Sequence, residues 1–310
     1  MYEWDNILPH LGNKQMVWWA QCSALCSAIA ARNIQHAQWK RDGLKRCAET
    51  GDLDGVKYLV ERCGADAHAR NDHALQWASC NGHLEVVRYL VENGLDVHAE
   101  DDLALRLASG DGHLEVVKYL GLKGANVHAL NEGGLQCASR HGQLEMVRYL
   151  VEECGADVHA SNDRSLGLAS KFGHLEVVRY LVEECGADAH AENELALRGA
   201  SFYGNLEVVK FLIQTGGADV HALNGTPLQY ASYNGHVQLV KFLIETGGAD
   251  VHANGDWALR KASENGQLEV VKYLVLDCGA DMHAGNDDAL REASKNGHIN
   301  VVEYLKSRGA

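Results

Sequence analysis

The sequence has little proline, no long apolar run and no excess of positive charge. Only 2 of its 310 residues are proline. Disordered linkers are usually rich in proline and serine, so no long linker is expected. A membrane-spanning helix needs ~20 consecutive apolar residues. The best candidate, residues 16–31, is shorter and is interrupted by Gln21, Ser23 and Ser27, so we expect no membrane span.

Acidic residues outnumber basic ones. Lys and Arg total 28 and Asp and Glu total 42, which gives a net charge of -14. Binding to a phosphate backbone needs clustered Lys and Arg, so we expect no nucleic-acid partner. The acidic balance favours basic partners only weakly, because an acidic surface also serves solubility.

Signals for secretion, disulfide bonding and catalysis are also missing. The 9 cysteines are an odd number spread over a long chain, whereas disulfide frameworks occur in small secreted domains. The start, MYEWDN, lacks the basic segment of a signal peptide. No phosphate-binding glycine loop, HExxH or GxSxG motif is present. We expect an intracellular, cytoplasmic protein that is not an enzyme and uses no cofactor or metal.

An internal repeat dominates the rest of the sequence. Three residue columns recur in one register, at spacings of 30 or 31 residues. The glycine column is Gly51, Gly82, Gly112, Gly142, Gly173, Gly204, Gly235, Gly266 and Gly297. An alanine stands four residues before most of these glycines, and a histidine column runs His68, His98, His128, His159, His190, His221, His252 and His283. Self-similarity at a fixed period predicts a repeat architecture.

Each repeat reads as two short helices. Residues 74–80 carry apolar positions three apart, and residues 84–92 place Leu84, Val87 and Leu90 on one stripe. Gly82 separates the two helices, because glycine tolerates the left-handed conformation that ends a helix. Residues 96–102 then connect to the next unit. Such a pair cannot bury its apolar face alone, so the units are predicted to stack on their neighbours.

The repeat resembles the ankyrin repeat. Thr226-Pro227-Leu228, followed by Gln229 and Ala231, is close to the Thr-Pro-Leu-His-x-Ala signature of that family. The resemblance covers residues 43–310 and implies an all-α solenoid of about nine helix–turn–helix units. The family period is about 33 residues. The shorter period here removes residues from the connection, so we expect the β-hairpin fingers of the family to be reduced to turns.

The short form is similar to the ankyrin repeats common in large DNA viruses of protists and in some amoebae. A viral origin would imply that the protein acts in the host cytoplasm.

The two ends of the chain are predicted to differ from the array. We expect residues 1–42 to form an N-terminal helical cap or half-repeat, since Asn33–Ala37 echoes the connecting loop, and the last unit of the 43–310 array to act as the C-terminal cap. An alternative is that residues 1–42 form an F-box-like adaptor segment, suggested by Leu8-Pro9, which would make the protein a substrate-recognition subunit of a ubiquitin ligase. A cap buries Trp18 and Trp19, whereas an adaptor exposes them.

The histidine column is not expected to bind metal. Zinc needs nitrogens ~2 Å from one ion, and stacked helices lie ~8–10 Å apart. We expect each imidazole to be buried and neutral and to bond to the backbone of its own loop. This predicts a pKa lowered below ~6.5 and a stability that falls with falling pH.

Positions that vary between units are the candidates for partner binding. They are the start of the first helix and the pair before the turn glycine, which the family resemblance places on the concave groove. Aromatic residues gather there in the middle and later units, and aromatic side chains are common interface anchors. The predicted partner-binding residues are Lys171, Phe172, Arg198, Phe202, Tyr203, Tyr230, Tyr233, Trp257 and Arg260.

Within this set we expect Phe202, Tyr203 and Tyr233 to be exposed. Tyr230 and Trp257 either share the surface or pack between units. The three cations are expected to serve acidic groups at the rim.

The predicted function is a scaffold or adaptor that binds an unidentified partner protein in the groove and is monomeric alone. The alternatives are a structural protein that associates with itself through the same groove, or the ubiquitin-ligase subunit described above. A fold shared by many binders does not name a partner.

Overall fold

A computed structural model describes residues 33–309, and in that range it contains helices and turns and no strand. This confirms the all-helical prediction. Trp18, Trp19 and the Leu8-Pro9 segment lie outside the described residues. Between residues 33 and 309, no helix has the length and apolar character that crossing a membrane requires.

The chain divides into two compact units. The first covers the described residues up to Ala108 together with Glu115–Ala125, and the second covers Ser109–Leu114 and the chain from Asn126 onward. The first unit is built from α2 (Asn33–Thr50), α3 (Leu53–Lys57) with a π-helical extension (Tyr58–Arg62), α4 (Ala69–Cys80), α5 (Leu84–Glu92), and most of α6 (Ala99–Gly110) and α7 (Leu114–Leu122).

The second unit repeats one helix pair. The first helices of its repeats are α8 (Ala129–Arg140), α10 (Ala160–Phe172), α12 (Ala191–Tyr203), α14 (Ala222–Tyr233), α16 (Ala253–Glu264) and α18 (Ala284–Lys295). The second helices are α9 (Leu144–Arg148) and α11 (Leu175–Arg179), each with a π-helical extension, then α13 (Leu206–Gln214), α15 (Val237–Glu245), α17 (Leu268–Leu276) and α19 (Ile299–Arg308).

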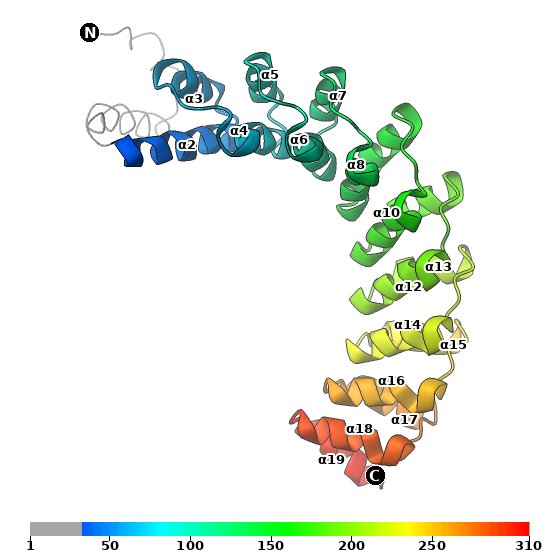
Figure 1. Ribbon diagram of the computed structural model, residues 1–310. Coiled ribbons are helices and arrows are strands. Elements are labelled where there is room, and N and C mark those ends of the chain that lie inside the picture. The colour runs from blue at the N-terminus through cyan, green and yellow to red at the C-terminus, as the bar shows by residue number, and fades with distance from the viewer. Residues whose placement is uncertain (1–32, 310) are drawn as a thin grey trace. The chain divides into compact units, whose positions relative to one another are not determined.

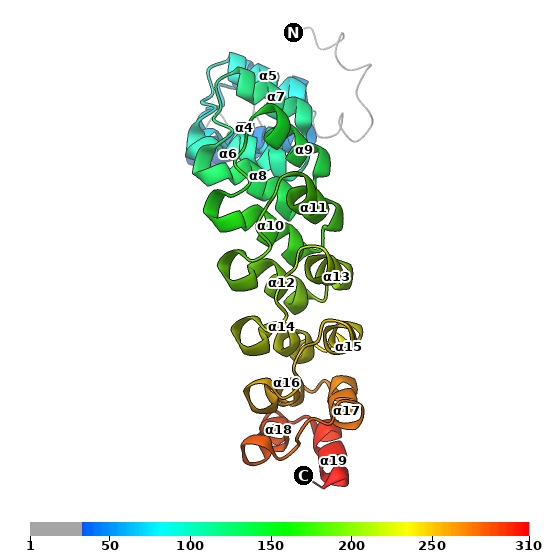
Figure 2. The ribbon, with the colours of Figure 1, turned by 90° about the vertical axis from the view of Figure 1, so that its right-hand side faces the viewer.

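First helices stack on first helices, and second helices lie beside second helices. Each of α10, α12, α14 and α16 contacts the first helix before and after it. Figure 1 shows α12, α14, α16 and α18 in one stack, and Figure 2 shows α13, α15, α17 and α19 in a second row beside it. The predicted stacking of helix pairs is therefore present within this unit.

Small and branched residues fill the space between the helices. Ala169 and Ala200 are fully buried on the first helices, which allows neighbouring helices to approach closely. Leu197 and Leu212 are also fully buried, one on each helix of the same repeat. Burial of such side chains stabilises the array repeat by repeat.

The turn glycines join successive repeats as well as ending helices. Gly142 has a φ of +74°, and a Cβ atom there would lie 2.4 Å from the His174 ring of the next repeat. The close approach lets His174 Nε2 bond to the carbonyl of Arg140 at 2.9 Å. Asn205 makes the equivalent contact, donating to the carbonyl of Lys171 at 2.8 Å. Histidine, asparagine and glutamine all occur at this position, and each can reach back with a polar nitrogen, as Gln267 does to the carbonyl of Tyr233 at 3.2 Å.

The connection between repeats is a short left-handed turn. Within the first residues of α10, three consecutive residues, Ser161, Asn162 and Asp163, have φ near +55° and are not helical. Non-glycine residues in this conformation cost ~1–2 kcal/mol each, so other interactions must hold the turn. The expectation that β-hairpin fingers are reduced to turns is confirmed for the described residues.

A buried carboxylate at the end of the turn supplies that interaction. Asp163 is almost fully buried. Its Oδ1 lies 3.0 Å from Nδ1 of His159 and also accepts the backbone N–H of Asp188, in the next repeat, at 3.0 Å. The same pair of contacts recurs at the equivalent positions Asp72 and Asp256. One side chain therefore closes its own turn and ties it to the following one.

The expectation for the histidines was wrong. Their rings are exposed or half exposed, not buried, and all except His221 bond to a carboxylate four residues later rather than to backbone; His190 Nδ1, for example, lies 2.6 Å from Glu194 Oε1. The hydrogen bond to Glu194 and its negative charge raise the pKa of His190. The sign of the expected pH dependence is therefore reversed at this residue.

Asn33–Ala37 also differs from expectation, because it forms the start of α2 instead of a loop. The loops need an aspartate or asparagine two residues before the histidine. The side-chain oxygen of that residue accepts the backbone N–H of the histidine, as Asp157 does for His159 at 2.9 Å. Ile34 and Lys40 stand at the acceptor and carboxylate positions. Both determinants of the turn are missing, so the helix continues without interruption past residue 42.

Truncating a core leucine is expected to destabilise the array. Leu212→Ala removes a fully buried side chain and should lower the free energy of unfolding by ~2–5 kcal/mol. Leu276→Ala is the matched control, because Leu276 is 53% exposed on α17. Chemical denaturation monitored by circular dichroism measures both. Equal losses for the two variants would contradict the packing described here.

The His190–Glu194 pair is expected to contribute a pH-dependent stability. Because the folded pKa of His190 lies above its unfolded value of ~6.5, the contribution is fully present below that value and is lost as pH rises through the folded pKa. His190→Gln should therefore lower the melting temperature more at about pH 5.5 than at about pH 8.5. His221→Gln is the control, since Gly225 stands at the carboxylate position. Equal losses for His190→Gln at both pH values would refute the pairing.

Candidate functional site

The predicted site residues come from the first helices of four neighbouring repeats in the second unit. Lys171 and Phe172 end α10, and Phe202 and Tyr203 end α12. Each of these helices stops because the next residue is a turn glycine; Gly173 adopts φ 81° and ψ 22°. Since α10, α12, α14 and α16 are stacked (Figure 1), equivalent positions on them form a continuous surface.

Four aromatic rings form a connected strip across this surface. Phe172 and Tyr203 have centroids 6.1 Å apart, Tyr203 and Phe202 are 5.1 Å apart, and Phe202 meets Tyr230 at 5.4 Å, nearly perpendicular. Edge-to-face and tilted contacts at these distances are favourable. As whole residues, Phe172, Tyr203, Phe202 and Tyr230 are 38%, 49%, 37% and 37% exposed. We call these four residues the aromatic strip.

A shallow depression continues the strip onto α14 and α16. Its volume is about 270 Å³, and its lining residues are Phe202, Gln229, Tyr230, Tyr233, Trp257, Lys261 and Glu264. Tyr233 is half-buried in this depression, where exposure was expected. Trp257 is also half-buried, and its ring is partly covered by the Arg260 guanidinium at 4.3 Å. The sequence allowed Tyr230 and Trp257 either to share the surface or to pack between units. In the structure, Tyr230 belongs to the exposed strip and Trp257 to the wall of the depression.

Two of the three predicted cations are engaged within the molecule. Arg198 donates from Nε to the carbonyl of Asn193 and from Nη2 to that of Glu192, both at 2.8 Å, and so holds its own left-handed turn. Arg260 forms an ion pair with Asp288 at 3.1 Å. Lys171 is different, because no carboxylate within the described residues lies at ion-pair distance from it. Its Nζ lies 5.3 Å from the Phe172 centroid and 5.2 Å from the Tyr203 centroid.

The structure adds Arg140 and Lys261 to the residues found from sequence. The Arg140 guanidinium lies 5.0 Å from the Phe172 ring, and Lys261 Nζ lies 5.0 Å from the Trp257 ring. Arg140 occupies the same pre-glycine position on α8 as Lys171 does on α10. Alignment of the repeats therefore contained the signal for Arg140, which the emphasis on aromatic residues missed.

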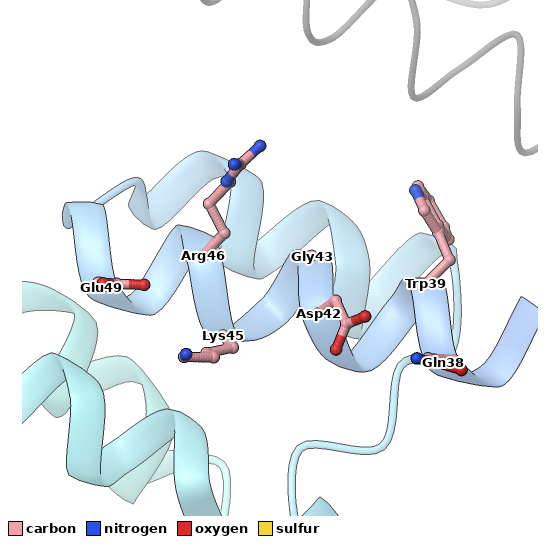
Figure 3. Close-up of a pocket in the computed structure, with 7 residues that line it drawn as sticks. All are labelled: Gln38, Trp39, Asp42, Gly43, Lys45, Arg46 and Glu49. Carbon is pink, nitrogen blue, oxygen red and sulfur yellow. The ribbon is translucent and has the colours of Figure 1, made fainter.

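A larger hollow lies in the first unit, along α2. It measures about 670 Å³ and is lined by Gln38, Trp39, Asp42, Gly43, Lys45, Arg46 and Glu49 (Figure 3). Every lining residue comes from one helix, so the hollow is an open helix surface and not an enclosed pocket. The aromatic strip, which four side chains from three helices build, is the better candidate for a specific site.

In the described part of the chain, no cluster of three or more His, Cys, Asp or Glu side chains is arranged to hold an ion. The turn carboxylates and histidines occur as pairs, one in each turn except the turn after His221, where Gly225 stands at the carboxylate position. Their contacts are used within and between the turns.

Comparison with known proteins gives one result. Residues 44–131, 105–193 and 196–286 match the family model described as ankyrin repeats (3 copies), and the three matches together cover well over half of the chain. No curated protein matches the sequence.

Proposed function

We propose that this chain, which belongs to the ankyrin-repeat family, is a scaffold or adaptor that holds a partner protein against the first helices of its second unit. Ankyrin repeats generally mediate protein–protein interaction, and proteins built from them are typically not enzymes. The observation that carries the proposal is the aromatic strip. No catalytic role is proposed.

The strip has the properties of an interface anchor. Each of the four residues is more than a third exposed, and contiguous exposed apolar surface commonly marks an interaction site. The rings contact one another and are attached to stacked helices. Little side-chain freedom is then lost on binding, and such preorganisation strengthens affinity. Aromatic residues in this setting are the usual hot spots of protein interfaces.

The finer proposal is a monomeric adaptor that works in a reducing, cytoplasmic compartment. Cys154, Cys185 and Cys278 carry free thiols, which is typical of proteins in reducing compartments. The repeat spacing of 30 or 31 residues, with left-handed turns in place of fingers, supports the similarity to the short repeats of large DNA viruses of protists. In that case the cytoplasm is that of the host.

We also propose that residues 1–42 belong to a cap at the start of the 43–310 array. A repeat array needs a terminal element that covers its last apolar face. The hollow along α2 (Figure 3) includes the indole of Trp39 beside polar residues, a surface suited to be covered by chain that precedes it.

Replacing two rings of the strip is expected to abolish partner capture without unfolding the protein. Phe202→Ala combined with Tyr203→Ala removes two hot-spot candidates, each expected to contribute ~2 kcal/mol or more to binding. Affinity purification from a cell lysate, with wild type and variant compared at equal melting temperature, measures the effect.

Leu276→Ala, which removes an exposed apolar side chain from α17, is the control. It should capture the same proteins as wild type. Identical captures by wild type and by the Phe202/Tyr203 variant would overturn the strip as the binding site.

A further inference from the structure

Three cations on the first helices of the second unit have, within the described residues, neither the carboxylate partner that most others have nor the backbone carbonyl acceptors that Arg198 has. Within the described residues, Arg140, Arg164 and Lys171 form no ion pair. Most other cations of this unit do so, as Lys210 does with Glu207 and Lys272 with Glu269. The exception is notable in a chain of net charge -14, because acidic residues are abundant enough to neutralise these groups.

The buried acidic residues at the start of α10 and α12 are already in use. Asp163, which precedes Arg164, is buried and accepts hydrogen bonds from His159 and from the backbone of Asp188. Glu194, at the equivalent position in the next repeat, is buried against His190. These carboxylates hold the left-handed turns, so they are not available to the three cations.

Two of the cations share one face of α10. Arg164 and Lys171 are seven residues apart, which is about two helical turns and ~10.5 Å along the axis. The residues between them on this face are Gly167, which lies against Leu195 of α12, and the half-buried Leu168. A partner chain in extended conformation rises ~3.3 Å per residue. Carboxylates about three residues apart on such a chain would match the two cations.

The third cation joins this pair to the aromatic strip. The guanidinium of Arg140 and the Lys171 ammonium lie on the Phe172 ring, at 5.0 Å and 5.3 Å, and Lys171 also reaches the Tyr203 ring at 5.2 Å. A cation on an aromatic face is oriented by the ring quadrupole. Positive charge is therefore fixed at one end of the strip. At the other end Lys261 is paired with Glu264 at 2.6 Å, which cancels its charge.

We propose that the partner segment held by this surface is acidic, with an aromatic or aliphatic side chain that packs on the strip while its carboxylates meet Arg164, Lys171 and Arg140. The proposal rests on the binding function proposed above and adds the chemistry of the partner. It differs from what the net charge alone suggests, because a chain of charge -14 would favour basic partners. Complementary charge of this kind mainly sets specificity and association rate.

Single-stranded nucleic acid is a poorer fit to the same surface. Aromatic rings and cations also bind unpaired bases. Three cations, however, offer few phosphate contacts, and the summed charge of the chain repels a polyanion. A flexible acidic peptide brings only a few charges, which the local cations can meet.

The test is selection of binding peptides with the full chain. A display library of short random-sequence peptides is panned against the wild type, and enriched sequences are synthesised with a fluorescent label for anisotropy titrations. Titrations use the wild type, the charge reversal Arg164→Glu/Lys171→Glu, the strip variant Phe202→Ala/Tyr203→Ala, and the control Lys210→Glu/Lys272→Glu. The control makes the same change in charge on the second helices α13 and α17. Circular dichroism checks that every variant is folded.

We expect enriched peptides to combine Asp or Glu with an aromatic or aliphatic residue. The charge reversal should weaken their binding about tenfold or more, with a smaller effect at high salt, and the control should not. Enriched peptides without acidic residues, or equal losses for reversal and control, overturn the proposal. If such peptides still lose binding to the strip variant, the binding function stands and only the partner chemistry fails.

Three further outcomes of these experiments would overturn the proposal or assign the surface to another ligand. Failure to enrich any peptide, or binding that no variant changes, overturns both the partner chemistry and the strip. Tight binding of a labelled oligouridylate that the charge reversal abolishes assigns the surface to nucleic acid instead. A dimer in sedimentation velocity that the reversal dissociates assigns it to a second copy of this acidic chain.

Discussion

A carboxylate at the end of the connecting turn, buried in most repeats, is the interaction on which the described structure most depends. The turn places three consecutive residues in the left-handed region, where side chains are strained. Asp163 offsets this strain by accepting hydrogen bonds from His159 behind it and from the backbone of Asp188 ahead of it. The histidine remains half exposed because its role is to contact the carboxylate. One repeat departs from this chemistry: Gly225 replaces the carboxylate, and glycine adopts the left-handed conformation without the same cost.

The binding surface follows from this turn. Because the connection is short, the first helix of each repeat begins directly after it. The last residues of that helix, just before the turn glycine, lie beside the last residues of the next first helix. Arg198 donates to the carbonyls of Glu192 and Asn193 in the turn, so its guanidinium is engaged within the molecule. Phe172, Phe202 and Tyr203 stand at the far ends of their helices, where nothing in the turn engages them, and they contact one another instead. Along the first helix, residues near its start, such as Arg198, therefore hold the turn, whereas residues at its end, such as Phe202 and Tyr203, remain available to a partner.

Repeated columns made much of the fold predictable. Two helices per unit, the turn glycines and the buried Leu and Ala positions all follow from periodicity in one register, and short connections predicted turns without strands. The left-handed turn was not predicted, because acidic residues alternate there between Asp163 and Glu194 and the column looks less regular than that of the histidines. The sequence signal for this turn was the spacing of four residues between a histidine and the acidic residue that follows it. For the surface, comparison of the repeats identified the varying positions, but it could not show that Arg260 is paired with Asp288 while Lys171 has no carboxylate beside it. That distinction depends on side-chain direction across neighbouring helices.

Amide hydrogen exchange tests the role of the buried carboxylate most directly. In the full chain carrying Asp163→Ala, the backbone N–H of Asp188 loses its acceptor, whereas that of Asp281 keeps Asp256 at 3.0 Å. We predict that exchange at Asp188 and through the turn at residues 159–163 becomes faster than in wild type, while protection at Asp281 is unchanged. Unaltered protection of the Asp188 amide in the variant would show that the carboxylate does not hold successive repeats together.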